Sequence, residues 1–151
     1  MNLIKITFII IISFYINLKV YAEPVHKNDY DVSEQVGIPT GVIFNPSGTK
    51  MYVTGFNGNS GRVAQYSLSV PYSTSSGVSL DANIITEIAA VLKRPQDIKF
   101  NSDGSKVLIL STKSIDGDKD SIAIWSLGTP YDITTISSTG VSEKILSNDP
   151  R

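Results

Sequence analysis

Apolar and polar residues alternate in short runs through residues 38–147, and clusters of turn-forming residues separate the runs. Val42 and Phe44 share one face of an early run, and Ile98 and Phe100 share one face of a later run, because side chains alternate along a strand. Further strands are expected at 84–90 and 141–146, although the alanines of the former segment would also allow a helical turn. The clearest runs predict strands at 41–45, 50–55, 62–69, 97–101, 106–111 and 122–127.

The chain contains two copies of one sequence unit. The segment IPTGVIFNPSGTK at residues 38–50 returns as RPQDIKFNSDGSK at residues 94–106, which is 56 positions further along. In both copies a tight turn joins the first two strands and contains a glycine, Gly48 or Gly104, that readily adopts a positive φ. A period of this length, filled with strands and turns, is typical of arrays such as the β-propeller, because one unit cannot bury its own faces.

We therefore expect an all-β fold, an incomplete β-propeller of about two blades in which each blade is a four-stranded antiparallel sheet. Blade 1 is predicted over residues 38–93 and blade 2 over 94–147, and residues 148–151 are interpreted as the start of a missing blade 3. Residues 23–37 are interpreted as an N-terminal segment with an orphan outer strand at 33–36. Because closure takes about 4 to 8 blades, a truncated chain is favoured, and a short chain that closes a ring by self-association is the alternative.

Residues 1–22 have the features of a secretory signal peptide. Lys5 provides a positive start, the segment from Ile6 to Ile16 is almost continuously apolar, and Ala22 is the small residue before the expected cleavage point. An uncleaved anchor is the alternative, but the apolar run is shorter than the roughly 20 residues that span a bilayer. We therefore expect a secreted or periplasmic protein that has no stable membrane span after the signal is cleaved.

Composition removes several classes of function. The chain contains no cysteine, which excludes disulfides, zinc–thiolate sites and a cysteine nucleophile. A secreted domain without disulfides is held by its core alone, and this suits a bacterial envelope better than a small extracellular eukaryotic module. The net charge of −1, with no basic stripe, gives no electrostatic footprint for nucleic acid, so no nucleic-acid partner is expected.

Three motifs recur in both copies of the unit. The turn reads Phe-Asn-x-Ser/Asp-Gly-Thr/Ser-Lys, the third strand reads Val/Ile-Ala-x-Tyr/Trp-Ser-Leu, and a Pro-Tyr pair follows at 71–72 and 130–131. With Tyr52-Val53-Thr54, these motifs resemble the bacterial β-propeller repeats of the YVTN/lactonase-like superfamily, although Gly55 replaces the final asparagine of the signature. The resemblance implies a propeller fold but no single function, since propellers serve as enzymes, binding modules and scaffolds.

The sharpest candidate for chemistry is an acidic loop in the second unit. Asp116, Asp118 and Asp120 stand at alternate positions and could supply oxygen ligands to Ca²⁺. An EF-hand would need glycine and an acidic residue where the chain has Ser121 and Leu127, and the equivalent loop of the first unit has no carboxylate. A solvated turn is therefore the alternative interpretation, and calcium is the one cofactor that the sequence suggests.

The other candidates point to structure rather than to catalysis. His26 is the only histidine, and a Ser-His-Asp triad would have to use it, although it lies in the polar segment after the signal. The resemblance implies that Asp97 lies near the channel of a propeller, but its counterpart in the first unit is Gly41, and one carboxylate makes no site. Tyr66 and Trp125 recur at one position of the third strand, where packing between blades is favoured over a carbohydrate-stacking platform.

The function predicted from these features is a non-catalytic binding or scaffold module whose ligand is an unknown protein or a glycan. No catalytic residue is predicted. The alternative is the remnant of a lactonase-like propeller hydrolase whose active residues lie in missing blades, and this alternative follows from the resemblance.

Overall fold

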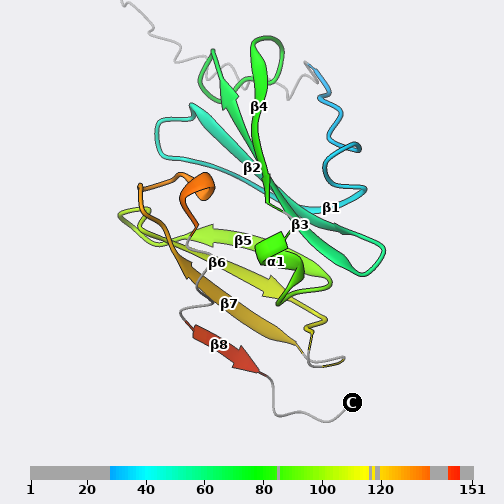
Figure 1. Cartoon of the computed structure of the whole chain (residues 1–151). Helices are drawn as coiled ribbons and strands as arrows, with labels where there is room; N and C mark the ends of the chain where they lie inside the picture. Colours follow the sequence, from blue (N-terminus) through cyan, green and yellow to red (C-terminus); the bar gives the residue numbers. More distant parts are fainter. Residues whose placement is uncertain (1–27, 85, 116, 118–119, 137–142, 147–151) are drawn as a thin grey trace, which may run out of the picture.

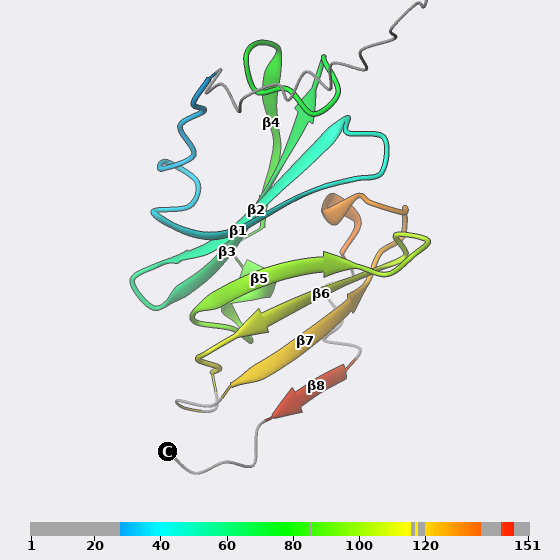
Figure 2. The same ribbon diagram turned by 180° about the vertical axis from the view of Figure 1, so that it is seen from behind.

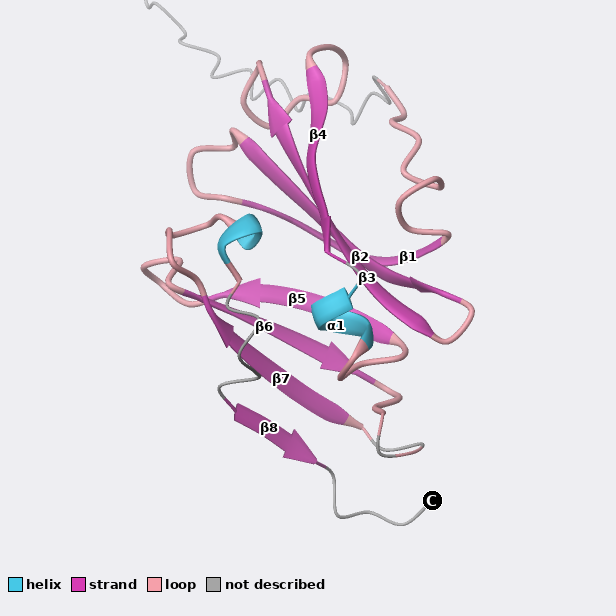
Figure 3. Cartoon of the chain, viewed as in Figure 1, coloured by secondary structure: helices cyan, strands magenta, loops and turns pink. Residues whose placement is uncertain are grey.

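The computed structural model describes residues 28–84, 86–115, 117, 120–136 and 143–146, and the regular structure of these residues is mostly β-strand (Figure 1; Figure 3). Two short helical turns interrupt the strands, α1 (Thr86–Ala89) after β4 and η1 (Ile133–Thr135) after β7. The expectation of an all-β fold is confirmed. The strands are β1 (Ile38–Phe44), β2 (Lys50–Asn57), β3 (Ser60–Leu68), β4 (Val78–Ile84), β5 (Pro95–Phe100), β6 (Lys106–Ser111), β7 (Ser121–Ser126) and β8 (Glu143–Leu146).

The described strands form two antiparallel four-stranded sheets. Sheet 1 has the order β1-β2-β3-β4 and sheet 2 has the order β5-β6-β7-β8, so each strand pairs with its neighbours in the chain. The first hairpin of each sheet has the same register shift, between Pro39 and Gly41 in sheet 1 and between Pro95 and Asp97 in sheet 2. Proline has no N–H to donate to a strand ladder, so an irregular register is expected where it enters a strand.

The fourth strand of sheet 1 lies earlier in the chain than the sequence predicts. A strand at 84–90 is wrong, because β4 ends at Ile84 and the chain then forms the helical turn that the alanines allow. The backbone N–H of Leu92 donates to the carbonyl of Ile88 at 2.7 Å, and both side chains are fully buried. Residues four apart lie on one face of a helix, and this turn places both apolar side chains in the core between the sheets.

The segment before β1 is also a turn, which corrects the orphan outer strand expected at 33–36. The backbone N–H of Val36 donates to the carbonyl of Val32 at 2.8 Å, and the buried Val36 side chain packs on sheet 1. The corresponding bond between Leu92 and Ile88 lies 56 residues later and has the same geometry. A helical turn therefore precedes β1 as one precedes β5, and both valines of the turn before β1 pack on sheet 1.

The turn between the first two strands is braced in the same way in both sheets. The side-chain oxygen Oδ1 of Asn45 accepts a hydrogen bond from the backbone N–H of Lys50 at 2.9 Å, and Asn101 makes the corresponding bond at 2.8 Å. Gly48 and Gly104 have φ angles of 70° and 72°, the positive values that the turn motif predicts. The asparagine and the glycine of the recurring motif are therefore explained by the geometry of one hairpin.

Each sheet has two faces, which we name by the direction of the chain. The N-side face is the one toward the preceding part of the chain, and the C-side face is the opposite one. In sheet 1 the N-side face carries Met51, Val53, Ala64, Tyr66 and Leu68, and the C-side face carries Tyr52, Thr54, Val63 and Gln65. In sheet 2 the N-side face carries Val107, Ile109, Ala123 and Trp125, and the C-side face carries Leu108, Leu110, Ile122 and Ile124.

The two sheets pack face to face, with the C-side face of sheet 1 against the N-side face of sheet 2 (Figure 2). Tyr52 of sheet 1 lies against Phe100 of sheet 2, with the ring centroids 4.6 Å apart. Ile88 from the α1 turn fills the same core, and Trp125 is almost fully buried there. A second, smaller core lies on the N-side face of sheet 1 beneath the segment that contains Val36.

Polar bonds fix how one sheet sits on the other. The buried Gln65 of β3 accepts a hydrogen bond from the backbone N–H of Ile133 in η1 at 2.9 Å. The hydroxyl of Tyr52 donates to the carbonyl of Tyr131, and Thr40 Oγ1 donates to the carbonyl of Pro95 at 2.8 Å. Because a buried polar group without its partner costs about 1–3 kcal/mol, these bonds favour one arrangement of the sheets over others.

Candidate functional site

The structure describes one of the three carboxylates of the predicted calcium loop. Asp116 and Asp118 lie outside the described residues, and Asp120 is half-buried immediately before β7. Among the residues that the structure describes, no three His, Cys, Asp or Glu side chains gather in a way that could hold a metal ion. Calcium binding by this loop therefore stays a prediction.

The other sequence candidates lie apart from one another, and His26 lies outside the described residues. Asp97 lies on sheet 2, where it contacts Lys99 Nζ at 3.6 Å and accepts a hydrogen bond from the backbone N–H of Ile98 at 2.9 Å. Tyr66 and Trp125 are both buried, with exposed fractions of 0% and 2%. Neither ring therefore offers a free face on which a sugar could stack.

A polar group that the sequence did not indicate links three strands of sheet 1. The Asp81 carboxylate of β4 accepts hydrogen bonds from Ser67 Oγ at 2.8 Å, from Gln65 Nε2 at 3.1 Å and from Lys50 Nζ at 3.1 Å. Burial acts to raise the pKa of Asp81, but these hydrogen bonds and the charge of Lys50 outweigh it and hold the pKa below its ordinary value of 3.8. The carboxylate is thus ionised at neutral pH and is engaged within the sheet, which indicates a structural role.

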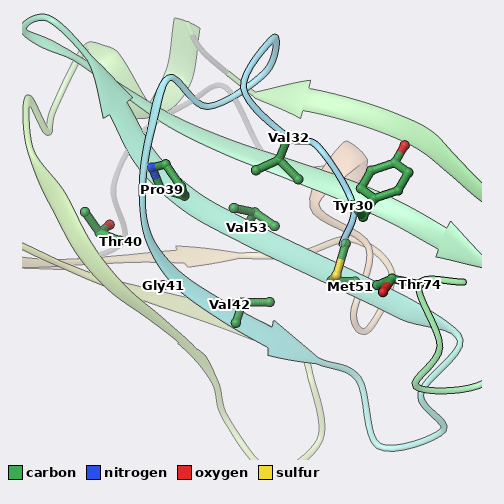
Figure 4. Close-up of a pocket in the computed structure, with 9 residues that line it drawn as sticks. All are labelled: Tyr30, Val32, Pro39, Thr40, Gly41, Val42, Met51, Val53 and Thr74. Carbon is green, nitrogen blue, oxygen red and sulfur yellow. The ribbon is translucent and has the colours of Figure 1, made fainter. Parts of the chain in front are cut away.

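An apolar pocket of about 450 Å³ lies on the N-side face of sheet 1 (Figure 4). Tyr30 and Val32 approach it from the segment before β1, Val42 lies on β1, and Met51 and Val53 lie on β2. Apart from the Tyr30 phenol, none of the described residues that line it has a side chain that titrates. The pocket therefore suits an apolar surface and lacks the groups that general acid–base catalysis requires.

A smaller apolar hollow of about 170 Å³ lies on the C-side face of sheet 2. Its lining consists of Leu108 and Leu110 of β6, Ile122 of β7, and Asp97 and Lys99 of β5. Leu110 and Ile122 are 43% and 36% exposed, so this face presents large aliphatic side chains to solvent. The stacked pair of sheets thus has an apolar surface at each end.

The sequence contains a signal for this second surface that alternation alone does not show. The run Val107-Leu108-Ile109-Leu110 in β6 is apolar at every position rather than at every second one. A short strand of this kind is typical of a sheet that is covered on both faces. The pocket of sheet 1 gives no comparable signal, because its lining includes Tyr30 and Val32 from a segment whose turn was not predicted.

Comparison of the chain with models of protein families, with curated proteins and with solved structures found no match. No helix among the described residues has the length and the apolar character that crossing a membrane requires. The fold that these observations establish is a pair of stacked antiparallel sheets, and the functional assignment depends on the surfaces of that pair.

Proposed function

We propose that this chain is a β-propeller segment of two blades that acts as a non-catalytic binding or scaffold module. The propeller assignment is supported by two sheets with the same strand order, the same register shift in the first hairpin and the same braced turn. The sheets also stack face to face, as successive blades do. The resemblance of the repeated unit to propeller repeats is in agreement with this assignment.

One observation carries the functional part of the proposal: both outward faces of the stacked pair present apolar side chains. Val42 is 58% exposed on the N-side face of sheet 1, and Leu110 is 43% exposed on the C-side face of sheet 2. Exposed apolar surface that is grouped around a hollow is typical of an interaction site. Because Tyr66 and Trp125 are buried, an apolar protein surface fits better than a glycan as the ligand.

We also propose that the module acts in the periplasm or outside the cell. This part depends on residues 1–22, which have the charge and the apolar run of a signal peptide but lie outside the described residues. A purified mature chain that still begins at Met1 would contradict it.

The apolar fluorophore anilinonaphthalene sulfonate (ANS) tests whether these faces are open in solution. At low protein concentration we expect ANS fluorescence to rise, and Val42→Glu to remove roughly half of the rise, because a carboxylate at one of the two apolar faces disfavours apolar binding there. Val70→Glu is the matched control, since Val70 is 48% exposed and lines neither hollow. Equal signals from the two variants would show that the N-side face is not a binding surface.

Lactone hydrolysis, measured with and without Ca²⁺, tests the non-catalytic part of the proposal. We expect no turnover above the buffer rate in either condition, because the pocket of sheet 1 lacks carboxylate and imidazole groups. Calcium-dependent turnover that is lost in Asp120→Asn would contradict the proposal and would favour the hydrolase alternative.

A further inference from the structure

The two outward faces of the molecule are of the same two kinds that already meet inside it. Within the chain, the C-side face of sheet 1 packs on the N-side face of sheet 2. Among the described residues, no further sheet packs on the C-side face of sheet 2 or on the N-side face of sheet 1. On the latter face the segment before β1 buries the residues of β2 and β3 and leaves Val42 of β1 exposed. The two outer faces are therefore of the same two kinds, one N-side and one C-side, as the two faces that pack between the sheets.

The two N-side faces differ in exposure on their first strands. Val42 of sheet 1 and Ile98 of sheet 2 occupy equivalent places, 56 residues apart, and each lies opposite a buried residue of the next strand. Ile98 is 1% exposed because sheet 1 packs on it, whereas Val42 is 58% exposed. The pocket beside Val42 therefore lies where side chains of a covering sheet would be inserted.

The C-side faces show the same difference. Thr54 and Val63 of sheet 1 are 0% and 1% exposed beneath sheet 2. Their equivalents on the outer face of sheet 2, Leu110 and Ile122, are 43% and 36% exposed. At these two positions the open face carries side chains at least as large as their buried equivalents. On β5 the open face carries Asp97 and Lys99, where β1 has Gly41 and Ile43.

The segment before β1 completes the N-side face rather than blocking it. Val32 and Val36 occupy the places that Ile88 and Leu92 occupy between the sheets, and they are held by the same backbone hydrogen bonds. Between sheets 1 and 2, the equivalent turn lies in the core together with both faces. The N-side face of sheet 1 thus has its turn in place and lacks the sheet that packs on it.

We propose that a second copy of this chain supplies that sheet, by docking the C-side face of its sheet 2 on the N-side face of sheet 1. The proposal rests on the propeller assignment made above, because it requires each contact to repeat the one between the two sheets. A contact between two different faces is heterologous, so it generates a closed ring if the rotation per copy closes and an open series if it does not. The occupant is a second copy because the chain already packs a C-side face on an N-side face once, and both open faces carry an apolar hollow.

The test uses one variant for each face of the purified full chain, Val42→Glu for the N-side face and Leu110→Glu for the C-side face. Light scattering should show the unchanged chain gaining molar mass as its concentration rises. Each variant alone should associate at least about tenfold more weakly, because docking would bury an unpaired carboxylate. Val70→Glu and Ile115→Glu are matched controls at exposed positions that line neither hollow, and both should associate like the unchanged chain.

An equimolar mixture of the two face variants is the decisive sample. Val42→Glu keeps an intact C-side face and Leu110→Glu keeps an intact N-side face, so the mixture should form pairs of chains and no larger species. A molar mass of one chain for the unchanged protein at every concentration overturns the proposal, as does pairing of either variant with itself. Association that neither substitution weakens also overturns it, since the contact would then lie elsewhere.

The ANS measurement distinguishes the absence of association between copies from a failure of the proposed binding function. A chain that stays single but binds ANS through the face around Val42 retains an open binding surface and excludes a second copy as its occupant. A chain that stays single and whose ANS signal is unaffected by Val42→Glu contradicts both proposals.

Discussion

At the scale of single residues, the turn glycine and the Pro-Tyr motif of each unit contact one another, and the contact is the same in both units. Tyr72 and Tyr131 are the non-glycine residues with positive φ among those described, at 56° and 57°. The backbone N–H of Tyr131 donates to the carbonyl of Gly104 at 2.9 Å, and its hydroxyl donates to the carbonyl of Ser102 at 3.0 Å. The sequence predicts the glycine turn but not the tyrosine that covers it, because the two lie more than twenty positions apart.

Substitution of Gly104 tests this contact. A Cβ at Gly104 would lie 2.3 Å from the Tyr131 ring, whereas a Cβ at Gly58 would meet no heavy atom within 4 Å. Both glycines have positive φ, so alanine at either position costs about 1–2 kcal/mol from backbone strain alone. We expect Gly104→Ala to lose roughly 2 kcal/mol more than Gly58→Ala in urea denaturation, because the ring must move. Equal losses would contradict the role given to the tyrosine.

At the scale of elements, alternation predicts most of the strands, while the connections between the sheets were predicted wrongly. β1–β3 and β5–β7 lie within a few residues of their predicted positions, because each has an apolar face that alternation marks. Strands were expected at 33–36 and 84–90, and helical turns form at 32–36 and 88–92. Their apolar residues are too few to define a helical period, and burial against the sheets decides their conformation.

The group around Asp81 was not predicted because it joins side chains from β2, β3 and β4, whose relative register the sequence alone does not give. Its effect on stability depends on pH. Because the pKa of Asp81 is lower in the folded chain than its ordinary value of 3.8, the carboxylate stabilises the fold above that pH. This contribution is lost as the pH falls below 3.8 toward the folded pKa.

Replacing Asp81 with asparagine tests this dependence. We expect Asp81→Asn to lower the free energy of unfolding at pH 7 by about 1–3 kcal/mol, because the donors from Lys50, Gln65 and Ser67 no longer meet a charged acceptor. The variant should also lose less stability than the unchanged chain between pH 5 and pH 3, as measured by denaturation at each pH. Glu34→Gln is the control, since Glu34 is exposed in the turn before β1. Parallel stability curves for Asp81→Asn and the unchanged chain would contradict the assignment.

At the scale of the whole molecule, the main core belongs to both sheets rather than to either one. Tyr52 and Val63 come from sheet 1, Ile98 and Trp125 come from sheet 2, and Ile88 comes from the turn between them. A single sheet would expose one of its apolar faces on losing its neighbour. We therefore expect the two sheets to unfold together.

Trp125 is the only tryptophan of the chain, and it lies on β7 of sheet 2 in the core that both sheets share. Val63→Ala removes buried methyl groups from sheet 1 and should lower the free energy of unfolding by about 2 kcal/mol. The midpoint of Trp125 fluorescence should fall together with that of the far-ultraviolet circular dichroism, at a protein concentration low enough to avoid association. Val70→Ala, in an exposed loop, should leave both midpoints nearly unchanged. A fluorescence midpoint unaffected by Val63→Ala would show that the sheets are independent.

The helical turn that precedes each sheet also determines where this chain divides into interchangeable modules. A module cut at residues 28–84 carries its own turn, four strands and both faces, whereas a module cut at Ile38 leaves the turn attached to its neighbour. A tandem gene duplication of residues 28–84 would add a module that already contains the helical turn by which it follows its neighbour. Engineered copies could be added in the same way, by joining them after the last strand of each sheet, so that every helical turn stays with the sheet that follows it.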